Sequence, residues 1–331
     1  MIACPTCKRE MPKHSPKRIN IYWGPSPLDY GPPGFLKQAL ERIPGVEVNR
    51  YECWGNPDLF GKADLHVMVD WGEDATPYWA FLPPEPRVYW TSDTHIGPGA
   101  RTYRMEKAAK SQRVFYSVMT YREDMEKLLC PPDSTYHYWM HNTSSWLPYA
   151  AEPQLWKPVD VEKVYDVGFI GHYGNYAARS QFISDFADAF GDRFYIGEQV
   201  YHEDHVRKSQ ACRLLLNHCQ GPSTNMRTFE GMSMGMVVLH PRTPDLAALG
   251  FEDGIHLLGY DTVEEAIEIA EAALSDPERM AQIGAAAREV VLSRHTYAHR
   301  AREIVALLDL HLSDEDVKSI NDVPCAAGWW A

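Results

Sequence analysis

The sequence predicts an α/β protein with two domains, each built on a parallel sheet covered by helices. Its 331 residues are about twice the length of an average domain. From residue 17 onward, short β-rich segments alternate with helical segments, the order typical of strand–helix–strand units in parallel sheets. Residues 146–153 contain two prolines and no periodicity, so they suit a linker between two such series.

The first series predicts an N-terminal domain over residues 1–148, with residues 1–16 as an extension. β-branched and aromatic residues favour its strands, and glycine- and proline-rich turns separate them. The strands are expected at residues 19–23, 46–51, 65–69, 87–91 and 114–117. The helices are expected at residues 35–43, 102–109 and 120–129.

The second series predicts a C-terminal domain over residues 149–331 that ends in closing helices, the last over about 297–312. The helix from Val263 has a capping box, because Thr262 precedes it and Glu265 follows three residues later. Another helix begins with Pro277 at its first position. Five strands, each followed by a loop and a helix, are expected at residues 165–170, 194–196, 214–217, 236–240 and 255–260.

Composition and charge exclude several classes of protein. Hydrophobic residues make up 45% and charged residues 23%, as in soluble globular proteins rather than disordered or fibrous ones. The net charge of −13 disfavours nucleic acid as the main partner unless a local basic cleft offsets it. No apolar segment approaches the roughly 18 residues that span a bilayer. The first residues lack a signal-peptide core and the seven cysteines are an odd number, so we expect a cytoplasmic protein.

The most informative segment, residues 221–239, contains a loop of small residues, a helix that opens at Asn225 or Met226, and a strand. The free N–H groups and positive dipole end of a helix N-terminus suit a pyrophosphate. Arg227 is a cation in the first turn, where it makes sense if its guanidinium holds phosphate oxygens. Glu230, one turn later, is suited to accept hydrogen bonds from a ribose diol. The alternative is an ordinary exposed helix with a local Arg–Glu pair.

This segment resembles the nucleotide-sugar motif of glycosyltransferases with two Rossmann-like domains facing across a cleft, the GT-B architecture. The matching run is Asn225-x-Arg227-x-Phe229-Glu230-x-Met232-x-x-Gly235-x-x-x-Leu239. More narrowly, the chain resembles the spore-maturation-protein (CgeB-like) type, which is related to glycosyltransferase groups 1 and 4. Residues 166–179, the linker at 147–158 and residues 294–301 also match that type. The resemblance covers about half the chain, and the N-terminal half is similar only in architecture.

The resemblance implies a metal-independent hexosyltransferase that moves a sugar from a nucleoside-diphosphate donor, such as a UDP-sugar, to a hydroxyl acceptor on a glycan, small molecule or protein. No cofactor is implied beyond this co-substrate. Glu230 matches the acid that binds the donor ribose, and Arg227 a residue near the diphosphate. Pro222 stands where the family's other acid is expected, so that acid's contact with the sugar is not carried over. The implied donor-binding residues are Gly171, His172, Tyr173, Asn175, Arg179, Asn225, Met226, Arg227 and Glu230.

Some of these residues allow a second interpretation. Arg179 is either a phosphate ligand or a cation on the helix surface. Asp93 and His95 follow a predicted strand, where either could act as general base on the acceptor or form an Asx turn. The acceptor side would include Asp70, which closes another strand, and residues of an early loop that also fits plain turn chemistry. These loop residues are Asp29, Tyr30 and Gly31.

A structural zinc is not expected. Cys4 and Cys7 have the spacing of half a zinc knuckle, but no second pair completes four ligands. His137 and His141 could supply two ligands from one helix face, a spacing that is common without a metal.

Three other functions fit parts of the sequence. A glycosyltransferase acting on DNA bases, such as hydroxymethylpyrimidines, is disfavoured by the negative charge. A sugar-nucleotide epimerase on the same architecture would convert the donor without an acceptor. A non-catalytic protein that binds sugar nucleotides or glycans would keep donor binding without transfer.

Overall fold

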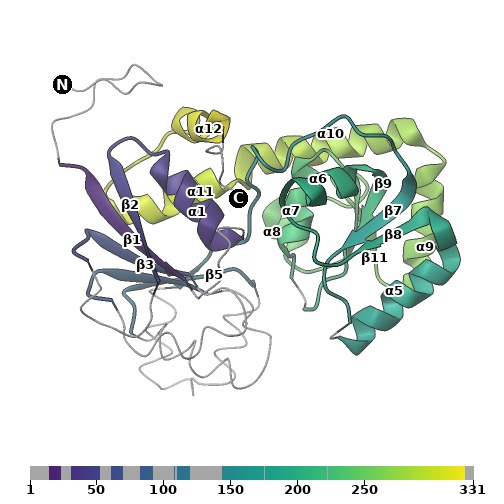
Figure 1. Ribbon diagram of the computed structural model, residues 1–331, viewed down its shortest axis with the longest axis horizontal. Coiled ribbons are helices and arrows are strands. Elements are labelled where there is room, and N and C mark those ends of the chain that lie inside the picture. Colours follow the sequence, from purple (N-terminus) through teal and green to yellow (C-terminus); the bar gives the residue numbers. More distant parts are fainter. Residues whose placement is uncertain are drawn as a thin grey trace. The chain divides into compact units, whose positions relative to one another are not determined.

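The computed structural model describes residues 15–23, 31–52, 61–69, 83–91, 108, 110–119, 144–174, 176–221 and 223–324. Contacts divide the chain into two units. Unit 1 comprises Met1–Pro148 and Tyr297–Ala331, and unit 2 comprises Tyr149–Thr296. Each unit contains a parallel sheet with helices packed against it (Figure 1), so the predicted α/β class is confirmed.

The sheet of unit 1 has six parallel strands in the order β2-β1-β3-β4-β5-β6. Its strands are β1 (Lys17–Trp23), β2 (Val46–Glu52), β3 (Leu65–Val69), β4 (Arg87–Thr91), β5 (Arg113–Tyr116) and β6 (Ser144–Trp146). Five of them lie within two residues of the predicted bounds. All of β3 is buried, as expected for a strand covered on both faces. The sequence did not predict β6, which is three residues long and starts with two serines.

The closing helices pack in unit 1. Helices α1 (Pro32–Glu41), α11 (Tyr297–Val305) and α12 (Asp314–Asp322) are in contact in that order (Figure 1). The Tyr297 ring is fully buried, with its centroid 5.2 Å from that of Phe35 and 6.5 Å from that of Trp90. The sequence assigned residues 297–331 to the C-terminal domain because they follow it along the chain. The chain instead returns to unit 1, where Tyr297 fills an aromatic core.

The sheet of unit 2 has five parallel strands in the order β11-β10-β9-β7-β8. The strands are β7 (Tyr165–Ile170), β8 (Phe194–Gly197), β9 (Cys212–Leu216), β10 (Val238–Pro241) and β11 (Leu258–Tyr260). The helices are α5 (Ala177–Phe190), α6 (His202–Gln210), α7 (Met226–Ser233), α8 (Leu246–Leu249), α9 (Val263–Leu274) and α10 (Pro277–Arg294). β11 begins later than predicted, because the backbone N–H of Ile255 bonds to the Glu252 carbonyl in a turn.

Alternation along the strands assigns side chains to the two faces of the unit 2 sheet. Leu214 and Leu216 join a core with residues of α5 and α9. Leu215, which lies between them, packs on the other face, where a Cβ atom at Gly231 of α7 would fall 3.1 Å from it; both Leu215 and Leu216 line a pocket with residues of α6 and α7. This period of two is the expected geometry of a strand covered on both faces. The face with α6 and α7 is therefore the one beside the candidate site.

The caps of the later helices follow the sequence closely. The Thr262 hydroxyl accepts the Glu265 N–H at 3.2 Å, while the Glu265 carboxylate reaches past the cap to the Asp261 N–H at 2.7 Å. The Asp276 carboxylate caps α10 by accepting the Arg279 N–H at 3.0 Å. No helix in the described ranges combines the length and the apolar character needed to cross a bilayer.

Both sheets place the second strand on one side of the first and the third on the other. In open parallel sheets, ligands bind at the carboxyl ends of the strands where the order reverses in this way. In unit 2 this point lies between β7 and β9, next to Gly171 and Asn217. In unit 1 it lies between β1 and β3, and the loops that follow those strands are outside the described residues.

Candidate functional site

The candidate site lies at the switch point of unit 2, where the loops after β7 and β9 meet the start of α7. The guanidinium carbon of Arg227 is 4.8 Å from the ring centroid of Phe169 on β7, which is cation–π distance. A Cβ atom at Gly171 would fall 2.8 Å from Nη1 of Arg227. Gly171 also has φ +152, which side-chain-bearing residues rarely adopt. The backbone conformation therefore favours glycine here, and its missing side chain leaves room for the guanidinium.

Arg227 has no counter-ion among the described residues. Its Nη1 is buried without a hydrogen-bond partner, and the described part of the chain shows no ion pair of the guanidinium. Burial, with a smaller effect of the nearby positive Arg179, lowers the pKa of Arg227 to about 10. Because a buried unpaired cation is costly, this arrangement suits an anion supplied from outside. The local Arg–Glu pair, the alternative from the sequence, is not formed.

Arg179, in the first turn of α5, is only 6% exposed and is not a surface cation. Its Nη1 donates to the His172 carbonyl at 2.8 Å and its Nη2 to the His218 carbonyl at 3.1 Å. These bonds tie the loop after β7 to the loop after β9. Nε of Arg179 and Nδ1 of His218 are buried without partners among the described residues. Burial, then the charges of Arg179 and Arg227, lower the pKa of His218 to about 4, so its imidazole is neutral.

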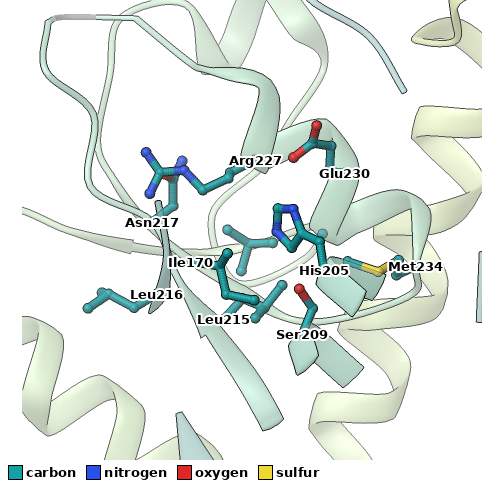
Figure 2. A pocket seen from close by; sticks show the side chains of 11 residues that line it. Ile170, His205, Ser209, Leu215, Leu216, Asn217, Arg227, Glu230 and Met234 are labelled. Carbon is teal, nitrogen blue, oxygen red and sulfur yellow. The ribbon is translucent and has the colours of Figure 1, made fainter. Parts of the chain in front are cut away.

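Glu230 is 4% exposed and lies one turn after Arg227 on α7. None of the described groups donates a hydrogen bond to its carboxylate. Burial raises the pKa of Glu230 to about 8, although the charge of Arg227 acts in the opposite direction. Figure 2 shows Arg227 and Glu230 projecting from α7 and the His205 ring beside them. The site therefore holds one buried acid with free acceptor oxygens.

A narrow pocket extends from Glu230 toward α6. Burial, then the charge of Arg227, lower the pKa of His205 to about 3, so this ring is neutral. The Ser209 hydroxyl is buried without a partner among the described residues. The pocket is lined by Ile170, His205, Ser209, Leu215, Leu216, Asn217, Arg227, Glu230, Gly231, Met234 and Val238 (Figure 2).

A buried hydrogen-bond network lies beneath the start of α7. The Asn217 amide donates to Asn225 Oδ1 and to Thr228 Oγ1, both at 3.1 Å, and accepts from Asn225 Nδ2 at 3.0 Å. His240 Nδ1 lies 2.6 Å from the Pro241 carbonyl, so Nδ1 carries the proton and Nε2 accepts the Thr228 hydroxyl at 2.9 Å. Burial lowers the pKa of His240 to about 4, which keeps the ring neutral.

This network changes the role of Asn225. α7 begins at Met226, one of its two predicted starts, so Asn225 occupies the N-cap position, where asparagine usually bonds to the first free N–H groups of its helix. Here its side chain bonds to Asn217 instead and makes no cap bond. No side chain at the cap position therefore occupies the N–H groups at the start of α7.

The remaining donor-side residues lie in the loop after β7 or at the start of α7. The Glu198 carboxylate accepts the Tyr173 N–H at 3.2 Å and lies 3.9 Å from His172 Nδ1. Met226 is the first residue of α7. Asn175 lies outside the described residues. The structure thus brings Gly171, Arg179, Asn225, Arg227 and Glu230 together, and their roles toward a donor stay predictions.

In unit 1, only Gly31 of the predicted site residues is described. It has φ +121 and its carbonyl accepts the Phe35 N–H at 3.0 Å, which is helix-start geometry. The other predicted acceptor-side, catalytic and metal-ligating residues lie outside the described ranges. They are Cys4, Cys7, Asp29, Tyr30, Asp70, Asp93, His95, His137 and His141. Among the residues that are described, no three His, Cys, Asp or Glu side chains cluster as a metal site would require.

Sequence reasoning missed several polar groups of the site, of which Asn217 and His205 are two. Asn217 directly follows a hydrophobic strand at the carboxyl edge of the sheet, a position where polar residues often serve ligands. That signal was present in the sequence. His205 stands in a strongly polar helix, and no local pattern distinguishes it from its exposed neighbours.

Comparison with known proteins gives a consistent result. Residues 163–306 match the family model described as "Glycosyl transferase-like". The match covers less than half of the chain and includes the segment from Gly171 to Glu230 that forms the candidate site. No curated protein matches the chain.

Several solved structures share the fold. HepE from Anabaena, in complex with UDP and glucose, aligns with a TM-score of 0.63 and 12% identity over 88% of this chain and 99% of that chain. A sucrose-phosphate synthase from Thermosynechococcus elongatus aligns at 0.59 and 12% identity over 88% and 98%. A glycosyltransferase from Rickettsia africae aligns at 0.58 and 9% identity over 93% and 100%. The chain therefore shares the GT-B fold with these structures, and residues 163–306 match a glycosyl transferase-like family model.

Proposed function

We propose that this protein is a glycosyltransferase that moves a hexose-type sugar from a nucleoside-diphosphate donor bound in unit 2 to a hydroxyl acceptor, without a metal ion. One observation carries the proposal. The guanidinium of Arg227, whose Nη1 is buried, lacks a counter-ion among the described residues and lies in the first turn of α7, whose cap side chain is bonded elsewhere. A diphosphate has the charge and the acceptor oxygens to fill this site.

The donor would bind with its diphosphate at Arg227 and at the first N–H groups of α7. Its ribose hydroxyls would donate to the Glu230 carboxylate, which has no other donor among the described residues. Gly171 would let the phosphates approach the backbone of the β7 loop. HepE, which shares the fold at low identity, is named as a complex with UDP and glucose. UDP and its sugars are therefore the first nucleotides to test.

In the transfer itself, the bond between the sugar's anomeric carbon and the diphosphate oxygen breaks, and the acceptor oxygen forms a new bond to that carbon. Negative charge grows on the departing diphosphate, where Arg227 and the helix N–H groups would stabilise it. In this proposal Arg227 and these N–H groups supply the positive charge that a metal ion would otherwise supply. The acceptor's proton would pass to a base, for which Asp93 and His95 remain the predicted residues.

Two narrower assignments rest on the sequence. The spore-maturation-protein type is supported by the matching segments in the linker and at residues 294–301. A cytoplasmic location is supported by the buried free thiols of Cys212 and Cys219, which suit a reducing compartment.

The proposal is tested by thermal unfolding of the purified protein with UDP, GDP, ADP and their sugars. A ligand at about 100 times its Kd adds roughly 2.7 kcal/mol to the free energy of unfolding. We expect one nucleotide series to raise the Tm, and Arg227→Met, which preserves packing on Phe169, to abolish the rise. Arg242→Gln is the control, because Arg242 forms only surface ion pairs with Asp253, Asp261 and Glu265. No rise with any nucleotide, or a full rise in Arg227→Met, would contradict the proposed donor site.

Analysis of the reaction products distinguishes a glycosyltransferase from a non-catalytic binding protein and from an epimerase. With the stabilising sugar nucleotide and water as a slow acceptor, a transferase releases free sugar and nucleoside diphosphate. Binding without release of either product favours a non-catalytic binding protein. A sugar nucleotide recovered with a changed sugar favours an epimerase.

A further inference from the structure

The loop before α7 is anchored by one buried carboxylate. Asp245, just before α8, is fully buried, and its Oδ2 accepts three hydrogen bonds. The donors are the Thr224 backbone N–H at 2.7 Å, the Thr224 hydroxyl at 2.8 Å and the Ser223 hydroxyl at 3.2 Å. The other carboxylate oxygen, Oδ1, is buried without a partner among the described residues. The carboxylate thus bonds to two consecutive loop residues through a single oxygen.

The charge of Asp245 also has no partner of opposite sign. No Lys, Arg or His in the described ranges forms an ion pair with it, so its three hydrogen bonds are what stabilise the buried anion. Burying a carboxylate without a cation is costly, whereas removing it would leave the Thr224 N–H and the two hydroxyls buried without this acceptor. The carboxylate is therefore better explained by the loop conformation that it imposes than by packing.

A second set of hydrogen bonds fixes Asn225, the next residue of the loop. Asn225 is bonded to Asn217, so residues 223–225 are fixed by two anchors, Asp245 and Asn217, that lie in different strand–helix connections. If the loop relaxed, the Asn225 side chain would be free to turn and cap α7, its usual role. It would then compete with a ligand for the same N–H groups. Arg227, two residues further on, would lose its fixed direction as well.

We propose that Asp245 is a positioning residue of the nucleotide site. By holding Ser223 and Thr224, it keeps the N–H groups of α7 open and Arg227 directed toward the phosphates of the bound nucleotide. This inference rests on the proposed donor site. It assigns to Asp245 an effect on phosphate binding alone, because the residue acts through the start of α7 and Arg227 and not through Glu230.

The test compares the affinities of UDP and uridine for the full-length protein by calorimetric titration, well below the Tm of every variant. We expect Asp245→Ala to raise the Kd of UDP about tenfold and to leave the Kd of uridine unchanged. Asp245→Asn, which keeps an acceptor oxygen but no charge, should have a smaller effect. Thr224→Val keeps the shape of its side chain and removes one of the three bonds, so a two- to fourfold rise is expected even if Asp245→Ala does not fold.

Asp253→Asn is the matched control. The Asp253 carboxylate also accepts a backbone N–H, that of Gly259 at 2.6 Å, and holds a turn in the same unit. This variant should lower the Tm without changing the Kd of UDP. The inference is overturned if Asp245→Asn and Thr224→Val lower only the Tm, or if UDP and uridine weaken equally. If the wild-type protein binds no nucleoside diphosphate, the proposed function falls and this inference falls with it.

Discussion

At the residue scale, Glu230 is buried and Arg227 is half-buried with its Nη1 enclosed, on consecutive turns of α7, yet no ion pair joins them. The folded protein holds a proton on Glu230 between its ordinary pKa of 4.5 and about 8, whereas the unfolded chain releases it. The free energy of unfolding therefore falls as the pH rises through this range. In the ligand-free protein, the unpaired side chains of Glu230 and Arg227 each lower the free energy of unfolding.

Glu230→Gln should consequently stabilise the ligand-free protein, because glutamine has no proton to lose. We expect the variant to exceed the wild type by on the order of 1 to 4 kcal/mol near pH 8, with the difference shrinking toward pH 5. Urea unfolding at several pH values measures it. Glu264→Gln, at an exposed position of α9, should leave the pH dependence unchanged. An equal effect of Glu230→Gln at pH 5 and pH 8 would contradict the raised pKa.

The same residue makes nucleotide binding depend on pH. A carboxylate that accepts hydrogen bonds from ribose hydroxyls is favoured in its charged form, so UDP binding near pH 7 should release a proton from Glu230. We expect the affinity for UDP to rise between pH 6.5 and 8 in the wild type and to rise less in Glu230→Gln. Calorimetric titration in buffers of different ionisation enthalpy counts the protons released. Identical pH profiles would show that Glu230 does not contact the nucleotide.

At the element scale, α7 is held in place by its packing on α10. Gly235 ends α7 with φ +73, and a Cβ atom at Gly284 of α10 would collide with the Gly235 carbonyl oxygen. Gly284→Ala should therefore destabilise the protein by about 1 to 3 kcal/mol, although alanine is the better helix former. It should also weaken UDP binding, since α7 carries Arg227 and Glu230.

The control for Gly284→Ala is the reverse change next to it. Ala285 is exposed on the same helix, so Ala285→Gly should cost about 1 kcal/mol through helix propensity alone and leave UDP binding intact. Chemical unfolding and calorimetric titration of both variants separate the two effects. A stabilising Gly284→Ala would show that α10 does not pack this closely on α7.

Helices and strands could be predicted where the sequence signal comes from neighbouring residues. The buried strand Leu65–Val69 and the capped start of α9 at Val263 lie at their predicted residues, because periodicity and capping involve neighbours in sequence. The start of α7 was predictable for the same reason. The bonds that define the site were not, since Arg179 to His218 and Thr224 to Asp245 join separate strand–helix connections, and Asn225 bonds to Asn217 in place of the cap bond that the local pattern favours.

At the scale of the whole molecule, hydrophobic patterns identify strands but not their neighbours. The shared strand order of the two sheets, which locates the switch point beside Gly171, became visible only in the structure. The assignment of residues 297–331 shows the same limit. Tyr297 follows unit 2 without a break, and its buried contacts with Phe35 and Trp90 are more than 200 residues away along the chain.

The division into two units predicts that they respond separately to mutation and ligand. Tyr297→Ala empties part of the aromatic core of unit 1 and should destabilise that unit by about 3 to 5 kcal/mol. Hydrogen exchange read by mass spectrometry should show faster exchange in β1, β4 and α1. Leu307→Ala, at a 43% exposed position of the same closing segment, should change exchange little.

UDP should act on the other unit. The hydrophobic core around β7 and β9 and the residues of the candidate site all lie within residues 149–296. We therefore expect UDP to slow exchange in β7, β9 and α7 equally in the wild type and in Tyr297→Ala. Binding free energy adds only to the stability of the unit that binds. Loss of this protection in Tyr297→Ala would mean that the two units fold as one cooperative body, and the donor site would then depend on the core of unit 1.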